Sequence, residues 1–83
     1  MIPNSATLQQ ALLQVLREYP LGLSSKEIDR LTAIKLNLAK EDLELIRSGS
    51  RTEFAYRMAW ERTHAKAKGL ITKGNSRNWI ISK

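Results

Sequence analysis

Basic side chains are concentrated in the second half of this 83-residue sequence, and they are the residues whose chemistry stands out. Residues 47–83 carry nine Lys or Arg and two acidic residues, whereas residues 1–46 carry five basic and six acidic ones. This split indicates a near-neutral scaffold followed by a cationic surface, which would attract a polyanion. The alternative is a solvated basic face without a partner. We expect the second half of the chain to bind a polyanion.

Eight side chains in two groups are the candidates for contact with nucleic acid. The first group lies near the start of an expected long helix, where a partial positive charge favours phosphate and Arg can bind guanine in the major groove. The second lies on an expected hairpin that can follow the backbone or enter the minor groove, although a merely solvated hairpin is the alternative. The groups are Arg51, Thr52, Tyr56 and Arg57, and Lys73, Asn75, Ser76 and Arg77.

Arg57 has two interpretations that the sequence leaves open. It can contact a base or a phosphate, or it can form an ion pair within its own helix. Glu53 and Glu61 stand four residues before and after it, which is the spacing of neighbours on a helix surface.

Patterns typical of a catalytic or metal centre do not occur in the sequence. There is no Cys, and His64, which has no Cys or Ser nucleophile pattern beside it, is interpreted as an exposed helix residue. No Asp or Glu has a Lys two positions later, as in the Glu-x-Lys pattern with which some nucleases hold a divalent ion. The four Gly occupy expected turns or helix ends rather than a phosphate loop. We expect no catalysis, no metal and no cofactor.

No apolar run approaches the roughly 20 residues that a membrane span needs. The N-terminal residues also lack the basic segment and apolar core of a signal peptide. We therefore expect a cytoplasmic protein.

The length gives room for one domain with a small core, over residues 1–83. Apolar residues at helical spacing predict a first helix over residues 6–19, ended by Pro20. A capping-box pattern at Ser24 and Glu27 begins a second helix that runs to about residue 36. A short third helix is expected over residues 39–46, with an acidic face that would repel phosphate. The expected buried residues of these helices are Leu8, Leu12, Val15, Leu16, Tyr19, Ile28, Leu31, Ile34, Leu38, Leu43 and Ile46.

The expected long helix begins near Arg51, because Ser50 and Glu53 form another capping-box pattern, and it ends before Gly69. It carries two apolar stripes on nearly opposite sides, and spacing alone does not decide which one faces the core. The stripes are Phe54, Met58 and Ala65, and Tyr56, Trp60, Thr63 and Ala67. We expect Phe54, Met58 and Trp60 to be buried. Trp60 and Trp79 are assigned to core packing rather than to an aromatic cage for a modified base.

Two β-prone runs around Gly74 and Asn75 predict a hairpin at the C-terminal end, with Lys73 and Arg77 beside its turn. Helices followed by a two-stranded ribbon are typical of the winged helix-turn-helix. The predicted fold is therefore mainly α with a small β-hairpin, and the long helix is expected to enter the major groove of duplex DNA.

The segment from Leu38 onward resembles the N-terminal domain of Mrr-type restriction endonucleases. The similar positions are Ser48, Gly49, Phe54, Arg57, Met58, Ala59, Trp60, Lys66, Gly69, Leu70, Arg77 and Trp79, and the Arg-x-x-Trp of the long helix is the most specific part. The resemblance is strong over residues 38–81 and weaker before. Two positions depart from the family's pattern: Tyr56 stands where Asn is usual, and Ala65 where a large apolar residue is usual.

The resemblance implies a winged-helix domain that binds double-stranded DNA, including methylated DNA. In the family it is joined to a C-terminal nuclease domain, and the whole enzyme restricts modified, typically methylated, foreign DNA. Two other interpretations stay open. One is a stand-alone winged-helix transcriptional regulator that binds paired half-sites as a dimer. The other is a protein-interaction winged helix whose basic face docks an acidic partner.

Overall fold

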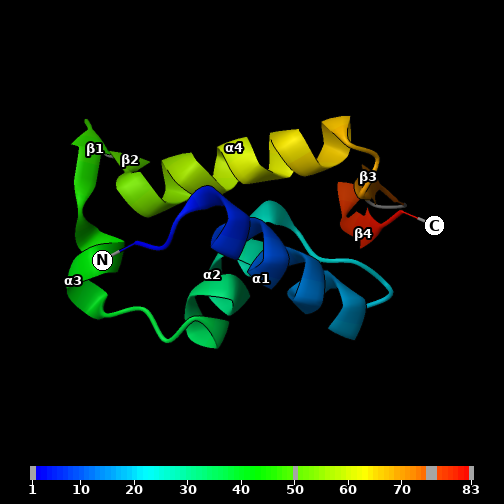
Figure 1. Cartoon of the computed structure of the whole chain (residues 1–83), viewed down its shortest axis with the longest axis horizontal. Coiled ribbons are helices and arrows are strands. Elements are labelled where there is room, and N and C mark those ends of the chain that lie inside the picture. The colour runs from blue at the N-terminus through cyan, green and yellow to red at the C-terminus, as the bar shows by residue number, and fades with distance from the viewer. Residues whose placement is uncertain (1, 50, 75–76, 83) are drawn as a thin grey trace.

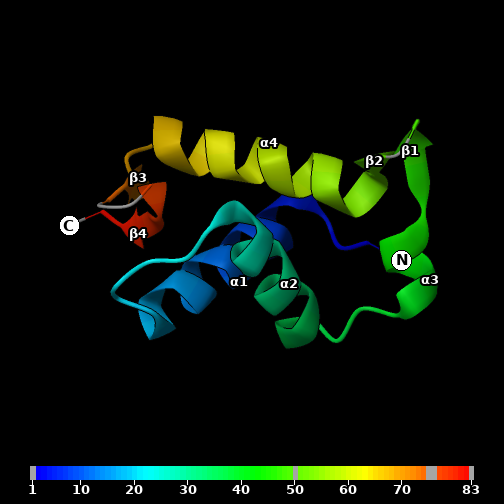
Figure 2. The same ribbon diagram turned by 180° about the vertical axis from the view of Figure 1, so that it is seen from behind.

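A computed structural model describes residues 2–49, 51–74 and 77–82. The longest helix, α4, lies across α1 and α2, and two small hairpins lie at its opposite ends (Figures 1 and 2). The elements in chain order are α1 (Ser5–Glu18), α2 (Ser25–Lys35), α3 (Lys40–Glu44), β1 (Ile46–Ser48), β2 (Arg51–Thr52), α4 (Glu53–Ala67), β3 (Ile71–Lys73) and β4 (Trp79–Ile81).

The first two helices begin and end close to their predicted bounds, because local capping signals determine them. At the start of α1, the Asn4 side chain accepts a hydrogen bond from the Thr7 N–H at 2.9 Å. At the start of α2, Ser24 and Glu27 form the predicted capping box, with both reciprocal bonds present. Each bond pairs an N–H group that has no partner within the first turn of the helix.

The core lies between α1, α2 and α4 and extends to the C-terminal hairpin. The fully buried side chains come from all these elements and include Leu8, Leu12, Leu16, Ile28, Thr32, Met58 and Ile71. α4 faces this core with Phe54, Met58 and Ala65, so the first of its two apolar stripes is the buried one. Packing therefore decides the question that the spacing left open.

The C-terminal hairpin is confirmed, and it is tied to the helices by a third extended segment. β3 and β4 pair antiparallel with Thr72 opposite Ile80. Leu23, in the turn between α1 and α2, forms an isolated antiparallel bridge with Trp79 through two backbone bonds of 3.0 and 2.8 Å. Trp79 is buried as expected, and its Nε1–H donates to Ser25 Oγ at 3.0 Å. This order of helices and hairpin is compatible with a winged-helix-like fold.

Glycines occupy two positions where the chain requires them. Gly69 ends α4 with φ 75°, in the predicted left-handed conformation. Gly22 has φ 97°, and a Cβ there would lie 2.9 Å from the side chains of Asn78 and Ile80 and from the Trp79 carbonyl. The close approach of this turn to β4 therefore requires glycine.

Four predicted core positions are wrong. Trp60 is 48% exposed because it lies on the side of α4 opposite Met58, which faces α1 and α2. Ile34 is 63% exposed, because α2 contacts the core through Ile28. Tyr19, at the end of α1, is 42% exposed. Ile46 is 62% exposed because α3 ends at Glu44 and Ile46 belongs to β1.

The start of α4 also differs from the prediction. Arg51 and Thr52 form β2, which pairs with β1 through Ile46 opposite Thr52, so the helix begins at Glu53. The Thr52 hydroxyl accepts from the Ala55 N–H at 3.1 Å and serves as the cap. Ser50, which the sequence suggested for that role, lies outside the described residues. None of the described helices is long and apolar enough to cross a membrane.

Two neighbouring residues of α4 provide a test of this packing. Met58→Ala should destabilise the domain by about 2–5 kcal/mol, because it leaves a cavity in the centre of the core. Trp60→Ala should cost about 1 kcal/mol or less, because the ring is half in solvent. Urea unfolding of both variants measures the difference. A larger loss for Trp60→Ala than for Met58→Ala would contradict the assignment of the buried stripe.

Candidate nucleic-acid interface

The solvent-facing side of α4 carries aromatic side chains at one-turn intervals. The ring centroids of Tyr56 and Trp60 lie 6.4 Å apart in an edge-to-face arrangement, and those of Trp60 and His64 lie 5.6 Å apart. His64 is exposed, as predicted. Together the three rings form an aromatic row along the helix, in which Trp60 and His64 are exposed and Tyr56 is half-buried.

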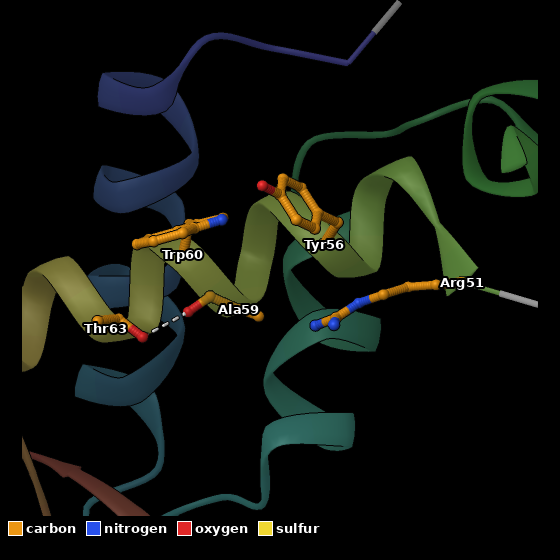
Figure 3. Close-up of a pocket in the computed structure, with 5 residues that line it drawn as sticks. All are labelled: Arg51, Tyr56, Ala59, Trp60 and Thr63. Carbon is orange, nitrogen blue, oxygen red and sulfur yellow. Dashed lines mark hydrogen bonds between the residues drawn. The ribbon is translucent and has the colours of Figure 1, made fainter. Parts of the chain in front are cut away.

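A shallow pocket of about 350 Å³ opens beside this row, lined by Arg51, Tyr56, Ala59, Trp60 and Thr63. Figure 3 shows Tyr56 and Trp60 on the same side of α4, with the Arg51 side chain extending along the helix from β2. The Thr63 hydroxyl donates to the Ala59 carbonyl at 3.0 Å, as the dashed line in Figure 3 marks. Small side chains at 59 and 63 leave the backbone of α4 accessible between the aromatic rings and Arg51.

Three Arg side chains surround the N-terminal end of α4. Glu53 accepts from Arg57 Nε at 2.8 Å and from Arg47 Nη1 at 2.9 Å, and these two bonds, Arg57 first, lower the pKa of the Glu53 carboxyl. The Arg47 guanidinium carbon lies 3.7 Å from the Tyr56 ring centroid, and that of Arg51 lies 5.6 Å from it. The predicted ion pair of Arg57 with Glu53 is therefore present, and contact of Arg57 with a base or a phosphate stays a prediction. Because this pair is exposed, the guanidinium can still turn towards a phosphate at small cost.

The predicted contact residues that the structure describes lie in two places, as the two predicted groups require. Arg51, Thr52, Tyr56 and Arg57 lie at the start of α4, although the Thr52 hydroxyl is occupied as the helix cap. The β3–β4 hairpin, with Lys73 and Arg77, lies at the other end of α4 (Figure 1). Lys73 and Arg77 are exposed, whereas Asn75 and Ser76 lie outside the described residues.

The side chain of Lys73 lies along its own hairpin. Lys73 Nζ donates to the Arg77 carbonyl at 3.0 Å and lies 4.2 Å from the centroid of the Trp79 ring. Arg77 has φ 63°, a left-handed conformation that places it in the turn between β3 and β4. Both cations are thereby held at the turn end of the hairpin.

Arg47 and Trp60 lie beside the predicted contact residues at the start of α4. The sequence does not predict either of them as a contact residue. In the sequence, Arg47 contributes only to the excess of basic residues after residue 46. Nothing in the local sequence indicates that residues 46–48 pair with residues 51–52. Trp60 was assigned to the core from its apolar neighbours at helical spacing. Two sequence signals could have indicated these contact residues. One is an Arg directly before a Ser-Gly turn, and the other is an aromatic residue on the second apolar stripe.

Polar contacts between helices fix the orientation of α4. Glu61 is only 5% exposed, and its carboxylate accepts a hydrogen bond from the hydroxyl of Ser5, the first residue of α1. Arg62 forms an ion pair with Asp29 of α2. Burial raises the pKa of Asp29 to about 6, although the neighbouring Arg62 lowers it. A buried charge tolerates little movement of its partner, so these contacts restrict rotation of α4 about its axis.

In the part of the chain that the structure describes, no three His, Asp or Glu side chains are grouped so that they could hold a metal ion.

Comparison with known proteins gives one family. The model of the Mrr N-terminal domain matches residues 6–83, and so extends through the first helices, where the sequence resemblance was weaker. The description is that of an N-terminal domain rather than a catalytic one. Among curated proteins and among solved structures, nothing matches the chain.

The raised pKa of Asp29 predicts a specific pH dependence of stability. Between the ordinary value of 3.8 and about 6, the folded state keeps a proton that the unfolded state has lost. The free energy of unfolding should therefore fall as pH rises through this window and level off above it. Asp29→Asn removes this titration, so the difference in stability between parent and variant should shrink or reverse over the same range. Urea unfolding from about pH 4 to pH 7 measures it, and a constant difference would contradict the assignment.

Proposed function

The chain belongs to the Mrr N-terminal domain family, and from this premise we propose that it is the double-stranded DNA-binding module of a restriction endonuclease. The family places the chain in the context of a restriction enzyme. The geometry of α4 supplies the support for DNA as the ligand. In this proposal the nuclease chemistry belongs to a separate C-terminal domain, and the enzyme acts in the cytoplasm, where foreign DNA arrives.

The observation that carries the proposal is that α4 presents little free negative charge, because both of its acidic side chains have partners within the protein. Glu53 is shared between two Arg side chains, and Glu61 is buried against Ser5. Arg62 is paired with Asp29, but the other described cations after residue 46 are exposed, and on α4 only Glu53 offsets their charge at the surface. A basic surface along one helix, continued by a basic hairpin, is the electrostatic pattern that attracts the DNA backbone.

The exposed side of α4 suits the major groove, which is about 12 Å wide and admits an α-helix. Ala59 and Thr63 allow the helix backbone to approach base edges closely, with Trp60 and Arg51 on either side of them. Lys73 and Arg77 of the β3–β4 hairpin then lie beside the sugar–phosphate backbone. In this arrangement the phosphate contacts fix the position of the domain, and α4 reads the bases.

We further propose that the domain prefers modified DNA, because its aromatic row lies beside hydrogen-bonding Arg side chains. A methyl group on a base edge is a small apolar feature of the major groove. Tyr56 and Trp60 provide apolar surface for it, and Arg51 and Arg57 provide donors nearby. Burying one methyl contributes about 0.8 kcal/mol, so the isolated domain should show a preference of only a few-fold.

The salt dependence of binding tests the DNA-binding function. If about four to six phosphates are neutralised, log affinity should fall with log salt with a slope of roughly −4 to −5. Lys73→Ala and Arg77→Ala should each flatten this slope by about one unit on any duplex. Fluorescence anisotropy across a salt series measures it. Absence of DNA binding at low salt would contradict the proposal and favour a domain that docks an acidic protein partner. Binding as a dimer to paired half-sites would instead favour a stand-alone transcriptional regulator.

The preference for modified DNA is tested on one duplex that carries adenine methylation, cytosine methylation or neither, at fixed salt. We expect one methylated form to bind a few-fold more tightly, and Tyr56→Ala to abolish the difference. Tyr56→Phe is the matched control, because it keeps the ring. Equal affinity for all three duplexes would leave a general DNA-binding domain, and selectivity that survives Tyr56→Ala would place the methyl contact elsewhere.

A further inference from the structure

The β1–β2 hairpin stands at the end of α4 opposite the β3–β4 hairpin (Figures 1 and 2). It joins α3 to α4. Ile46 pairs with Thr52 and Ser48 with Arg51, and Gly49 makes the turn with φ 54°. The hairpin carries two exposed Arg, at positions 47 and 51. Each end of α4 is therefore flanked by a small basic hairpin.

Arg47 is held in a defined position yet remains accessible. Its guanidinium is bonded to Glu53 at 2.9 Å and lies over the Tyr56 ring at 3.7 Å, while 43% of its side chain is exposed. Since Glu53 is also bonded to Arg57, one carboxylate serves two guanidinium groups. With Arg51 close by, the cluster keeps an excess of positive charge. A side chain already ordered in this way loses less conformational entropy when it binds a phosphate.

We propose that the β1–β2 hairpin is a second wing that binds the DNA backbone, with Arg47 as its phosphate-contacting residue. Glu53 and Tyr56 position the Arg47 guanidinium, and Arg51 adds a second cation beside it. This inference rests on the proposed DNA-binding function. It adds a contact element and a residue that the α4 and β3–β4 surface does not contain.

The length of α4 determines where the two wings meet the duplex. Its 15 residues extend about 22 Å at 1.5 Å per residue. The major groove is about 12 Å wide, so a helix lying in it has the backbone of one strand on each side. Wings at the two ends of the helix therefore contact different stretches of backbone. We expect two separated clusters of phosphate contacts, one for each hairpin.

Phosphate-ethylation interference on a duplex of about two helical turns tests this arrangement, together with the salt slope. Arg47→Ala should remove one cluster and flatten the slope by about one unit, whereas Lys73→Ala should remove the other cluster. Lys40→Ala is the matched control, because it deletes an exposed basic residue from α3. It should leave both clusters in place.

A second variant separates charge from structure. Arg47→Gln is neutral but can still bond Glu53 and cover part of the Tyr56 ring, so it should lose the same phosphate cluster as Arg47→Ala. If Arg47→Gln keeps the phosphate cluster and the salt slope of the parent, then Arg47 only stabilises the hairpin. That result would overturn the proposal of a second wing. An unchanged pattern of phosphate-ethylation interference with Arg47→Ala would also overturn the second wing. In that case, loss of one cluster with Lys73→Ala would show that the proposed DNA binding itself still holds. Failure of the parent domain to bind any duplex would instead overturn the proposed function.

Discussion

The packing of one apolar stripe of α4 against the other helices sets the orientation of the whole helix, and with it the exposed surface of the domain. Met58 is fully buried, and Phe54 and Ala65 extend the same stripe against α1 and α2. In a domain this small, a single layer of side chains between three helices supplies most of the core. Because α4 can bury only one of its two apolar stripes, the other is left to solvent. The position of the aromatic row and its flanking cations on the outer side of α4 thus follows from the same packing that holds the domain together.

Polar contacts then fix the rotation that apolar packing leaves adjustable. The buried Glu61 is hydrogen-bonded to Ser5, and Arg62 is paired with Asp29, so consecutive residues of α4 are tied to α1 and α2 respectively. Burying a charge is unfavourable unless it is paired, and such pairs are sensitive to the geometry between their partners. The same contacts remove negative charge from the surface. Structural polar contacts and the electrostatic character of the exposed face are therefore coupled.

The exposed face combines features that rarely serve the stability of a small soluble domain. Trp60 is half exposed between Tyr56 and His64, and large aromatic side chains on a surface are typical of contact sites. Small residues beside them open a pocket, and Arg51 lies at its edge. With a basic hairpin at each end of α4, these features support the proposal of a ligand that is long, anionic and grooved. This combination, more than the total charge, favours duplex DNA over a compact acidic partner.

Features that depend on neighbours a few residues apart could be predicted from the amino-acid sequence alone. These are the near-neutral first half and basic second half, the capping box of α2, the end of α4 at Gly69 and the pairing of β3 with β4. Only the tertiary structure decided which stripe of α4 is buried, and hence that Trp60 faces solvent. It also placed Ile46 in a strand with Thr52, which moved the start of α4 to Glu53 and brought Arg47 onto Tyr56. The reason is that caps and turns are stabilised by bonds within one turn of chain. The burial of a helix with two apolar sides depends instead on partners more than 40 positions away, such as Leu8 and Leu12 of α1.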